Sequence, residues 1–371
     1  MKILIVGGGI AGCACAALLQ KEGFTDVTLI DKAPEFRNIG YLMGIWNTGR
    51  KVLKELGIDM QIEKNSCEYD SDIVFDRNGK LLKLVPGEEF NTLGTVSIRR
   101  NDLHQSLFNL LDKTSVRFNT ACVSIKQNEE KAEVEFSNGT KEVFDLVIGA
   151  DGVHSSVREM IFGKNFLRRY GWRVWMWWLP REHESSNSVT SYYGSGKICG
   201  ILPFFDTSVA ILFAKVPLKR SNEKDQQPAV LFKDFCSEVQ NLITTMPSVK
   251  EMYHDDIAYV EMPLWHKGNV VLIGDSQHAV SPTTGMGASM AMEDAWVLVQ
   301  ELKRGETIAK ALSSFATRRE KRIRRFRRIV NQMDRWTMAH GLLGYVRNKI
   351  ITVVPARYFI QVLRHFVEAE I

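Results

Sequence analysis

The 371-residue chain lacks the features that point to a secreted, membrane-spanning or metal-dependent protein. Its six cysteines form no C-x-x-C pair and no regular framework, which is typical of a reducing compartment. No run approaches the roughly 20 apolar residues that a membrane span needs. Glycine appears by residue 7, which leaves no room for a signal peptide. The cysteine usage predicts a cytoplasmic protein, and because we find no metal-ligand cluster we expect no metal; we also find no Ser/His/Asp arrangement.

Charge is modest and unevenly placed. The net charge is +5, but residues 317–330 hold eight basic side chains and one acid, so the rest of the chain sums to −2. Apolar residues recur there at helical steps, which predicts a long amphipathic helix with a solvated basic face. A weak membrane-surface contact or a funnel for an anionic substrate are the alternatives. Nucleic acid is not expected as a partner, because no aromatic residues for base stacking alternate with the charges.

A glycine pattern follows the first strand. Lys2 to Val6 is almost wholly apolar, as expected of a parallel strand buried on both faces. Gly7, Gly9 and Gly12 then give the G-x-G-x-x-G spacing, which suits a tight turn, a close approach to a pyrophosphate and helix packing on the strand. Asp31 ends the next strand, 19 residues after Gly12, where a carboxylate can bind a ribose diol. The pattern predicts a bound dinucleotide.

Two further glycine–acid pairs follow predicted strands. Asp151-Gly152 comes mid-chain, and Gly274-Asp275 opens a segment that runs to Gly287. Between about 170 and 264, aromatic residues crowd short alternating runs, which predicts an antiparallel sheet inserted into the nucleotide domain. Two Asn-Gly turns, at Asn78-Gly79 and Asn138-Gly139, predict hairpins.

The three signatures, in this order, resemble the FAD-dependent monooxygenases of the para-hydroxybenzoate hydroxylase type, or class A flavoprotein monooxygenases. The resemblance implies an α/β protein with a Rossmann-like FAD-binding domain, an inserted, mostly antiparallel substrate sheet, and C-terminal helices. We expect the FAD-binding domain at 1–70, 98–170 and 265–330, and the substrate domain at 71–97 and 171–264. Residues 331–371 would form a helical cover.

The resemblance also assigns residues to the cofactor. Pro282 and the backbone from Gly285 through Met286 to Gly287 would border the flavin ring. The implied FAD contacts are Gly7, Gly9, Ala11, Gly12, Asp31, Lys32, Arg37, Gly40, Arg100, Val123, Asp151, Gly152, Gly274, Asp275, Pro282, Gly285 and Gly287. No second G-x-G-x-x-G opens a βαβ unit, so NADPH or NADH is expected to bind only transiently.

The family's chemistry is carried by the flavin, so no protein side chain is expected to be catalytic. NAD(P)H would reduce FAD, O2 would add at C4a, and the hydroperoxide would hydroxylate or epoxidise a small aromatic or polycyclic substrate. The candidates for the substrate wall are Met43, Trp175, Trp177, Tyr192, Tyr193, Phe204, Phe205 and Met286. Either a monomer or a homodimer is compatible with the sequence.

Three alternatives stay open. Trp175-x-Trp177-x-Leu179-Pro180 resembles an element of the flavin halogenases, for which product formation would require chloride. A polyprenyl-lipid reductase would differ from a monooxygenase in consuming no dioxygen with its substrate. A non-catalytic FAD-binding module would show no substrate-stimulated oxidation of NAD(P)H.

Overall fold

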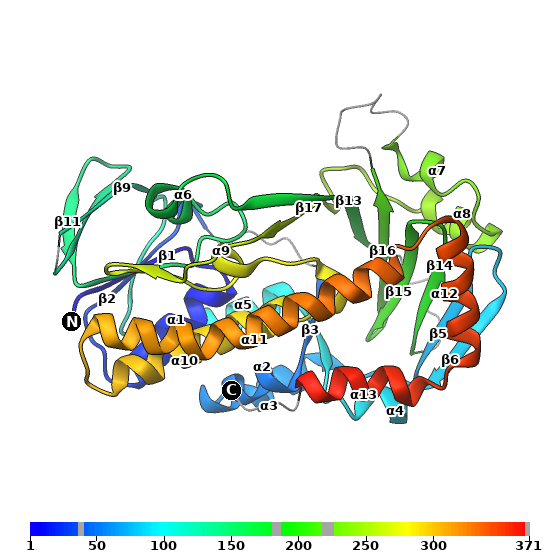
Figure 1. The fold of residues 1–371 in the computed structure, drawn as a ribbon, viewed down its shortest axis with the longest axis horizontal. Coiled ribbons are helices and arrows are strands. Elements are labelled where there is room, and N and C mark those ends of the chain that lie inside the picture. Colours follow the sequence, from blue (N-terminus) through cyan, green and yellow to red (C-terminus); the bar gives the residue numbers. More distant parts are fainter. Residues whose placement is uncertain (36–40, 129, 180–186, 217–225, 368–371) are drawn as a thin grey trace.

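Two β-sheets at opposite ends of the molecule organise the chain (Figure 1). The computed structural model describes residues 1–35, 41–128, 130–179, 187–216 and 226–367. Within them no helix has both the length and the apolar character needed to span a membrane. The fold is the predicted one: an α/β nucleotide-binding half, an antiparallel-rich sheet and C-terminal helices.

The first sheet has six strands in the order β18-β19-β12-β1-β2-β8. All neighbouring pairs are parallel except the one between β18 and β19. Its strands are β1 (Ile3–Val6), β2 (Val27–Ile30), β8 (Ser115–Arg117), β12 (Leu146–Gly149), β18 (His266–Lys267) and β19 (Val270–Leu272). Every residue of β1, β2, β12 and β19 is buried, which is why these segments read as continuous apolar runs.

The second large sheet has seven strands in the order β17-β13-β16-β15-β14-β5-β6. They are β5 (Ser71–Asp76), β6 (Leu81–Pro86), β13 (Leu167–Trp178), β14 (Ser188–Tyr193), β15 (Lys197–Phe204), β16 (Thr207–Lys215) and β17 (Tyr253–Val260). Only β14 and β5 pair in parallel. The hairpin predicted at Asn78-Gly79 is confirmed as β5 and β6, and β5 pairs with β14, whose residues come 117 positions later in the chain.

Two three-stranded sheets complete the strand inventory. One consists of β9 (Cys122–Gln127), β10 (Ala132–Phe136) and β11 (Lys141–Phe144), and it contains the hairpin predicted at Asn138-Gly139. The other consists of β3 (Leu42–Ile45), β4 (Ser66–Cys67) and β7 (Val96–Arg99).

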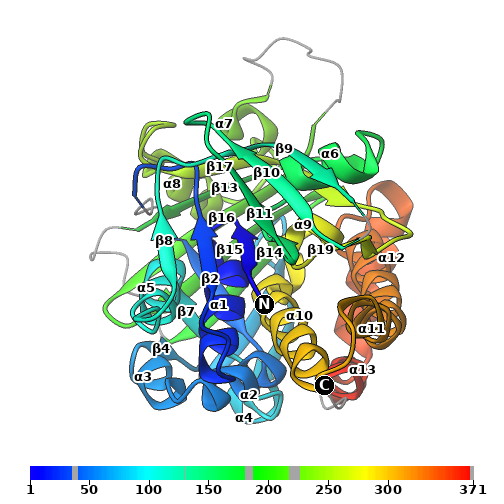
Figure 2. The same cartoon turned by 90° about the vertical axis from the view of Figure 1, so that its left-hand side faces the viewer.

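Helices cover the sheets and link the two halves. In chain order they are α1 (Ile10–Lys21), α2 (Asn47–Glu55), α3 (Asp59–Lys64), α4 (Gly87–Asn91), α5 (Arg100–Phe108), α6 (Ser156–Phe162), α7 (Pro228–Leu231), α8 (Ser237–Thr244), α9 (Asp275–His278), the 3-10 helix η3 (Pro282–Thr284), α10 (Gly287–Lys303), α11 (Ile308–Thr337), α12 (Gly341–Val353) and α13 (Ala356–Val367). The predicted long basic helix is α11. It crosses the molecule from the parallel sheet toward the antiparallel one, and α12 and α13 lie on the same side (Figures 1 and 2).

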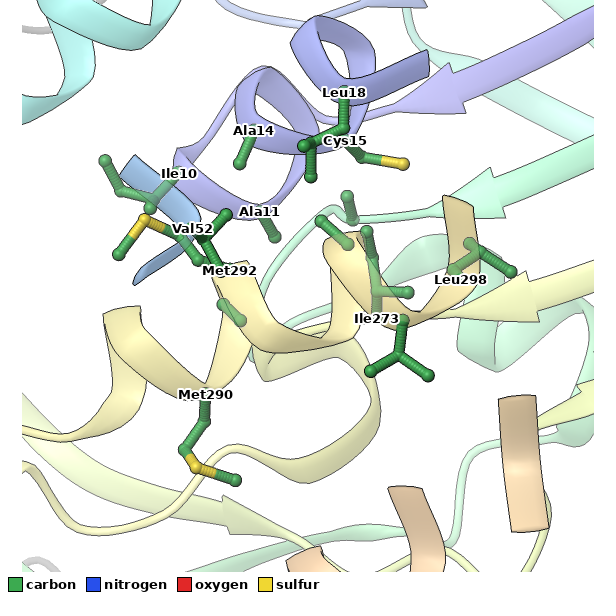
Figure 3. Close-up of a cluster of buried hydrophobic side chains, with 14 of the residues drawn as sticks. Ile10, Ala11, Ala14, Cys15, Leu18, Val52, Ile273, Met290, Met292 and Leu298 are labelled. Carbon is green, nitrogen blue, oxygen red and sulfur yellow. The ribbon is translucent and has the colours of Figure 1, made fainter. Parts of the chain in front are cut away.

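Small residues let α1 and α10 pack closely in the core. Ala11, Ala14 and Cys15 of α1 are buried together with Met292 and Leu298 of α10 (Figure 3). Because these α1 side chains are short, the two helix axes can approach each other beside the glycine-rich turn. The cysteines therefore serve as small apolar residues, and burial raises the pKa of Cys15 to about 12.

Candidate functional site

The three glycine signatures meet at one edge of the parallel sheet. Strands β1, β12 and β19 are neighbours that run in parallel, so their carboxyl ends lie together. A Cβ placed on Gly7 would lie 2.5 Å from the carbonyl oxygen of Ala150, so only glycine fits against the second signature. The backbone of Ile273 donates to the carbonyl oxygen of Gly149 at 3.0 Å, which joins the third signature to the second. Ligand sites in open α/β sheets occupy this edge.

The first turn has the geometry of a pyrophosphate site. A Cβ on Gly12 would lie 1.9 Å from the carbonyl oxygen of Gly7, so glycine is required for the turn to fold back on α1. A Cβ on Gly9 would meet nothing within 4 Å, and no side chain caps the N-terminus of α1. Among the described residues, the first backbone N–H groups of α1 therefore have no capping side chain, and a helix N-terminus of this kind favours an anion. Ala11 lies in this first turn and is buried.

Asp31 lies against the same turn. Its Oδ2 accepts from the backbone N–H of Gly8 and its Oδ1 from that of Ala33, both at 2.8 Å. These bonds hold the carboxylate at the end of β2, where a ribose would lie. Lys32, the next residue, is exposed. Arg37 and Gly40 lie outside the described residues.

The acid of the second signature, Asp151, forms hydrogen bonds within the protein. Asp151 Oδ2 accepts from the backbone N–H groups of Ser156 at 2.7 Å and Val157 at 3.1 Å, so the carboxylate caps α6. Gly152, with φ +79°, borders open space. The buried Arg158 then donates to the carbonyl oxygen of Ser276 at 2.9 Å, and this bond ties the second signature to the third.

The charges of Asp275 and Arg100 act on each other although 175 residues separate the two residues in the chain. Asp275 is exposed, yet burial by the surrounding protein raises the pKa of its carboxyl; the charges of His278 and, to a lesser extent, Arg100 oppose that rise, and Asp294 adds to it. Both properties are expected of a carboxylate on the wall of a hollow in the protein. The guanidinium carbon of Arg100 lies 5.9 Å from the ring centre of Tyr41. This acid–base pair therefore offers one acceptor and one cation to a ligand between the loops.

A buried cluster of charged side chains holds the turn at Gly274. Asp294 Oδ2 accepts from the backbone N–H of Gly274 at 2.8 Å and lies 2.5 Å from His278 Nε2. Its Oδ1 accepts from Arg319 Nε at 2.7 Å, and Arg319 also donates to Glu293 at 2.7 Å. Burial would raise the pKa of Asp294, but His278, Arg319 and these hydrogen bonds together hold it below its ordinary value. The cluster fixes the turn that carries Asp275.

The last loop leads into α10 beside β3. Gly285 has φ +62°, and a Cβ there would lie 3.6 Å from the backbone nitrogen of Gly44. A Cβ on Gly287 would meet nothing within 4 Å, and no side chain caps α10. Pro282 is exposed, and the neighbouring Thr283 donates to the buried Asp334 of α11 at 2.5 Å. Within the described part of the chain, the N-terminus of α10 therefore lacks a side-chain cap, and its dipole favours negative charge there.

An edge strand borders the adenine end of the predicted site. Among the described strands, β9 pairs with β10 alone and is therefore the edge strand of its sheet. Val123 lies on this strand and is exposed. This edge is compatible with the contact that the sequence assigns to Val123.

The described residues together fit an FAD molecule. Two helix N-termini, at Gly9 and Gly287, have no side-chain cap, and an added Cβ on either glycine would meet nothing within 4 Å; one N-terminus suits the pyrophosphate and the other the electron-rich edge of a flavin ring. Asp31 and Asp275 supply carboxylate acceptors for ribose and ribityl hydroxyls, and Arg100 supplies a cation. The contacts within the protein that are described above position each of these groups.

The aromatic residues predicted to form the substrate wall lie on two opposite faces of the antiparallel sheet. Trp175, Trp177 and Tyr192 lie in one buried cluster with Phe232 and Leu242, on the face covered by α7 and α8. The opposite face, toward β3 and α11, carries another set: Leu42, Trp172, Val174, Met176, Ile198, Phe204, Val209, Phe213, Ile257 and Met338, with Tyr41, Trp178, Tyr193 and Tyr253 packed against them. The two faces differ because successive residues of a strand point in opposite directions.

The remaining substrate candidates lie near the flavin loops or at the surface. Met43 of β3 is half-buried, and Met286, in the loop before α10, is buried; both pack in the core cluster of the nucleotide domain. Phe205 is exposed at the β15–β16 turn, and its ring lies 4.8 Å from that of Phe204.

Sequence reasoning missed several residues that support the site. His104 Nε2 lies 2.5 Å from the carbonyl oxygen of Gly8, and burial lowers its pKa, so it stays neutral at physiological pH. Arg319 was expected on a solvated basic face, but it is 1% exposed and bonded to Glu293 and Asp294. The sequence contained a signal for this inward arginine. Glu293 and Asp294 are adjacent acids in the helix that follows Gly287, and buried carboxylates need a cation as partner.

Comparison with known families identifies a match over most of the chain. Residues 1–330 match the family described as FAD binding domain. The chain is 30% identical over 370 residues to 2-heptyl-3-hydroxy-4(1H)-quinolone synthase of Pseudomonas aeruginosa, which covers 96% of this chain and 94% of that protein. It is 32% identical over 314 residues to a flavin-dependent monooxygenase of Legionella longbeachae, covering 82% of this chain and 80% of that one.

Solved structures share the fold. Klebsiella pneumoniae HpxO, complexed with FAD and uric acid, superposes with a TM-score of 0.88 at 22% identity, over 99% of this chain and 96% of that one. The tetracycline destructase Tet(51) gives a TM-score of 0.75 at 24% identity, over 100% of this chain and 99% of that one.

Proposed function

Because the chain belongs to the class A FAD-dependent monooxygenases, we propose that it uses NAD(P)H and O2 to hydroxylate or epoxidise a flat, largely apolar heteroaromatic molecule. FAD is the cofactor of this family, and NAD(P)H is its usual reductant. When bound, the flavin accepts a hydride and activates dioxygen for transfer of one oxygen atom to the substrate. The protein's task is to hold, orient and shield the reactants.

The substrate site is proposed between the flavin loops and one face of the antiparallel sheet. The observation that carries this proposal is one apolar cluster on the sheet. It contains Met176, Phe204 and Phe213 of the sheet together with Leu42 of β3 and Met338, which follows α11. Apolar and aromatic walls suit a flat ligand and exclude water from the reacting atoms. This placement narrows the substrate candidates to Met43, Tyr193, Phe204 and Met286, because the others lie on the far face or at the surface.

The cofactor would be held by the loops at the edge of the parallel sheet. The N–H groups that follow Gly9 and the carboxylate of Asp31 would hold the pyrophosphate and adenosine end. Asp275 and Arg100 would bind the middle of the molecule. The N-terminus of α10 at Gly287 would stabilise negative charge on the adjacent ring edge, because N–H groups and the helix dipole point toward it.

The chemistry of a relative suggests the substrate class. The Pseudomonas relative is named for a product that carries a hydroxyl at position 3 of a bicyclic quinolone with a heptyl chain. A molecule of this kind combines a flat ring system with an apolar tail, and both parts suit an aromatic and aliphatic wall such as Met176 and Phe204 provide. We therefore propose an alkyl-substituted bicyclic heteroaromatic as the substrate class.

The test is a screen of such compounds with the purified holoenzyme. A substrate should stimulate NADPH or NADH oxidation and yield a product heavier by one oxygen atom, with the label arriving from 18O2. The absence of an oxygenated product from all alkylquinolones and related bicyclic heteroaromatics, or turnover of uric acid analogues or tetracyclines alone, would refute the proposed substrate class. Product formation that requires chloride would instead favour the halogenase alternative.

A further inference from the structure

The C-terminal helices carry a concentration of exposed apolar side chains. Among the described residues, 18 large apolar side chains are exposed, and seven of them lie between Trp336 and Tyr358. Leu342 is 79% exposed and Val353 is 76% exposed. Single exposed apolar residues are ordinary, but a cluster of this kind marks an interaction surface.

On α12, three of the exposed apolar side chains share one side of the helix with a lysine. Leu342, Val346, Lys349 and Val353 follow one another at steps of three and four residues and are all exposed. The opposite side faces the protein, because the buried Arg347 donates to the carbonyl oxygen of Gly194 at 3.0 Å. The apolar stripe therefore points away from the body of the molecule.

A basic ridge on α11 leads to this stripe. Lys321, Arg325, Arg328 and Arg335 are exposed and lie four, three and seven residues apart, so they share one side of the helix. The inward side of α11 is apolar and includes the buried Phe326. Helices α11 and α12 lie on the same side of the molecule, nearest the viewer in Figure 1 and at the right edge in Figure 2. The ridge ends at Arg335, beside the exposed Trp336, and α12 with its apolar stripe begins at Gly341.

Acidic side chains are scarce among the described residues of this region. Residues 321–367 contain eleven Lys and Arg residues and a single acid, Asp334, which is buried under the loop of Thr283. The α11–α12 side of the described structure is thus both apolar and cationic. We refer to its outward residues as the C-terminal face; they are Lys321, Arg325, Arg328, Arg335, Trp336, Leu342, Leu343, Tyr345, Val346, Lys349 and Val353.

We propose that the C-terminal face docks on an anionic lipid surface. Tryptophan, tyrosine and leucine beside lysine and arginine form the composition that lies in the plane of a membrane interface, and the cations attract anionic headgroups. A second copy of the chain fits less well, because a symmetric contact would bring two cationic faces together. The proposal is independent of the reaction that the enzyme performs.

Vesicle flotation tests the proposal. The holoenzyme is mixed with vesicles of phosphatidylcholine alone or of phosphatidylcholine with phosphatidylglycerol, at low and high NaCl. Binding should appear only with phosphatidylglycerol and should fall as salt rises, because salt screens the attraction. The double variant Leu342→Asp/Leu343→Asp and the triple variant R325E/R328E/R335E should each lower the partition coefficient by about tenfold or more.

Matched substitutions on another surface serve as controls. Met60→Asp on α3, where Met60 is 74% exposed, and Lys51→Glu on α2 should leave vesicle binding unchanged. Retained FAD and an unchanged melting temperature establish that each variant is folded. Equal binding by all variants, or no binding of the wild-type protein to anionic vesicles, would overturn the proposal. A wild-type dimer that Leu342→Asp/Leu343→Asp converts to a monomer would show that a second copy covers this face instead.

Discussion

Gly44 of β3 and Gly285 of the loop before α10 lie backbone against backbone. A Cβ on Gly44 would lie 3.5 Å from the carbonyl oxygen of Gly285, and one on Gly285 would lie 3.6 Å from the nitrogen of Gly44. Two segments about 240 residues apart thus form one wall, in which an added Cβ would come into ordinary van der Waals contact with the opposite segment. The same loop places Gly287, two residues on, at an open N-terminus of α10.

Gly287→Val should separate cofactor binding from folding. The site has no atom within 4 Å of the added Cβ, so the unfolding free energy of the apoprotein should change by less than about 1 kcal/mol. The isopropyl group should instead occupy the space of the flavin and raise the FAD dissociation constant by about tenfold or more. Gly285→Ala is the contrast: its φ of +62° should cost the apoprotein itself about 1–2 kcal/mol. Unchanged FAD affinity in Gly287→Val would contradict the assignment.

Asp294→Ala should destabilise the protein strongly. The carboxylate is fully buried and accepts from Gly274, His278 and Arg319, so its removal leaves buried donors without an acceptor. Loss of one partner of such a cluster costs about 3–5 kcal/mol. Urea unfolding measures the loss, and flavin content should fall with it because Gly274 loses its anchor. Glu320→Gln breaks an exposed ion pair on α11 and should cost less than about 1 kcal/mol. Similar losses in the two variants would refute the role of Asp294.

Asp334 should make stability decrease as pH rises through the acidic range. Burial raises its pKa to about 6, against hydrogen bonds from Thr283 and Ser281. Between the ordinary pKa of an aspartate, about 4, and pH 6, the folded protein therefore holds more protons than the unfolded chain. Its contribution is fully present at lower pH and is lost as pH rises to about 6, at a cost of up to about 3 kcal/mol.

Asp334→Asn should remove that dependence. Its neutral amide oxygen still accepts from Thr283, so the difference in unfolding free energy between variant and wild type should grow in the variant's favour from pH 4.5 to pH 8. Urea titrations at both pH values give the difference. A difference that stays constant would show that Asp334 does not titrate in this way. Asp72, whose pKa burial also raises to about 6, acts in the same direction in both proteins and cancels in the comparison.

Tyr193 and Tyr192 provide a matched test of the proposed substrate wall. They are neighbours on β14, but Tyr193 packs on the face toward β3, while Tyr192 stacks on Phe75 on the other face, with ring centres 5.2 Å apart. Tyr193→Leu should raise the KM for the substrate several-fold, since it reshapes the wall. Tyr192→Leu should lower the melting temperature and leave KM unchanged. The reverse pattern would place the substrate under α7 and α8.

The sequence alone predicts the nucleotide half of this protein well. The strands β1, β12 and β19 are short, fully buried runs that end at or just before glycines. The local spacing of apolar residues and glycines therefore predicts both the strands and ligand-binding turns after them. The order of Gly7–Gly12, Asp151-Gly152 and Gly274-Asp275 was enough to indicate FAD, because glycine is needed wherever backbone meets backbone or ligand.

Only the tertiary structure decides which way side chains face. Alternation along β13 and β14 gives the period of a strand but not which face meets β3 and α11, so the sequence groups Trp175, Trp177 and Tyr192 with Tyr193 and Phe204. Likewise, helical spacing predicted a basic α11 but could not tell that Arg319 turns inward to Asp294 while Arg325 stays exposed. These outcomes depend on partners far away in the chain, since burial of a charge is stable only where an opposite charge meets it.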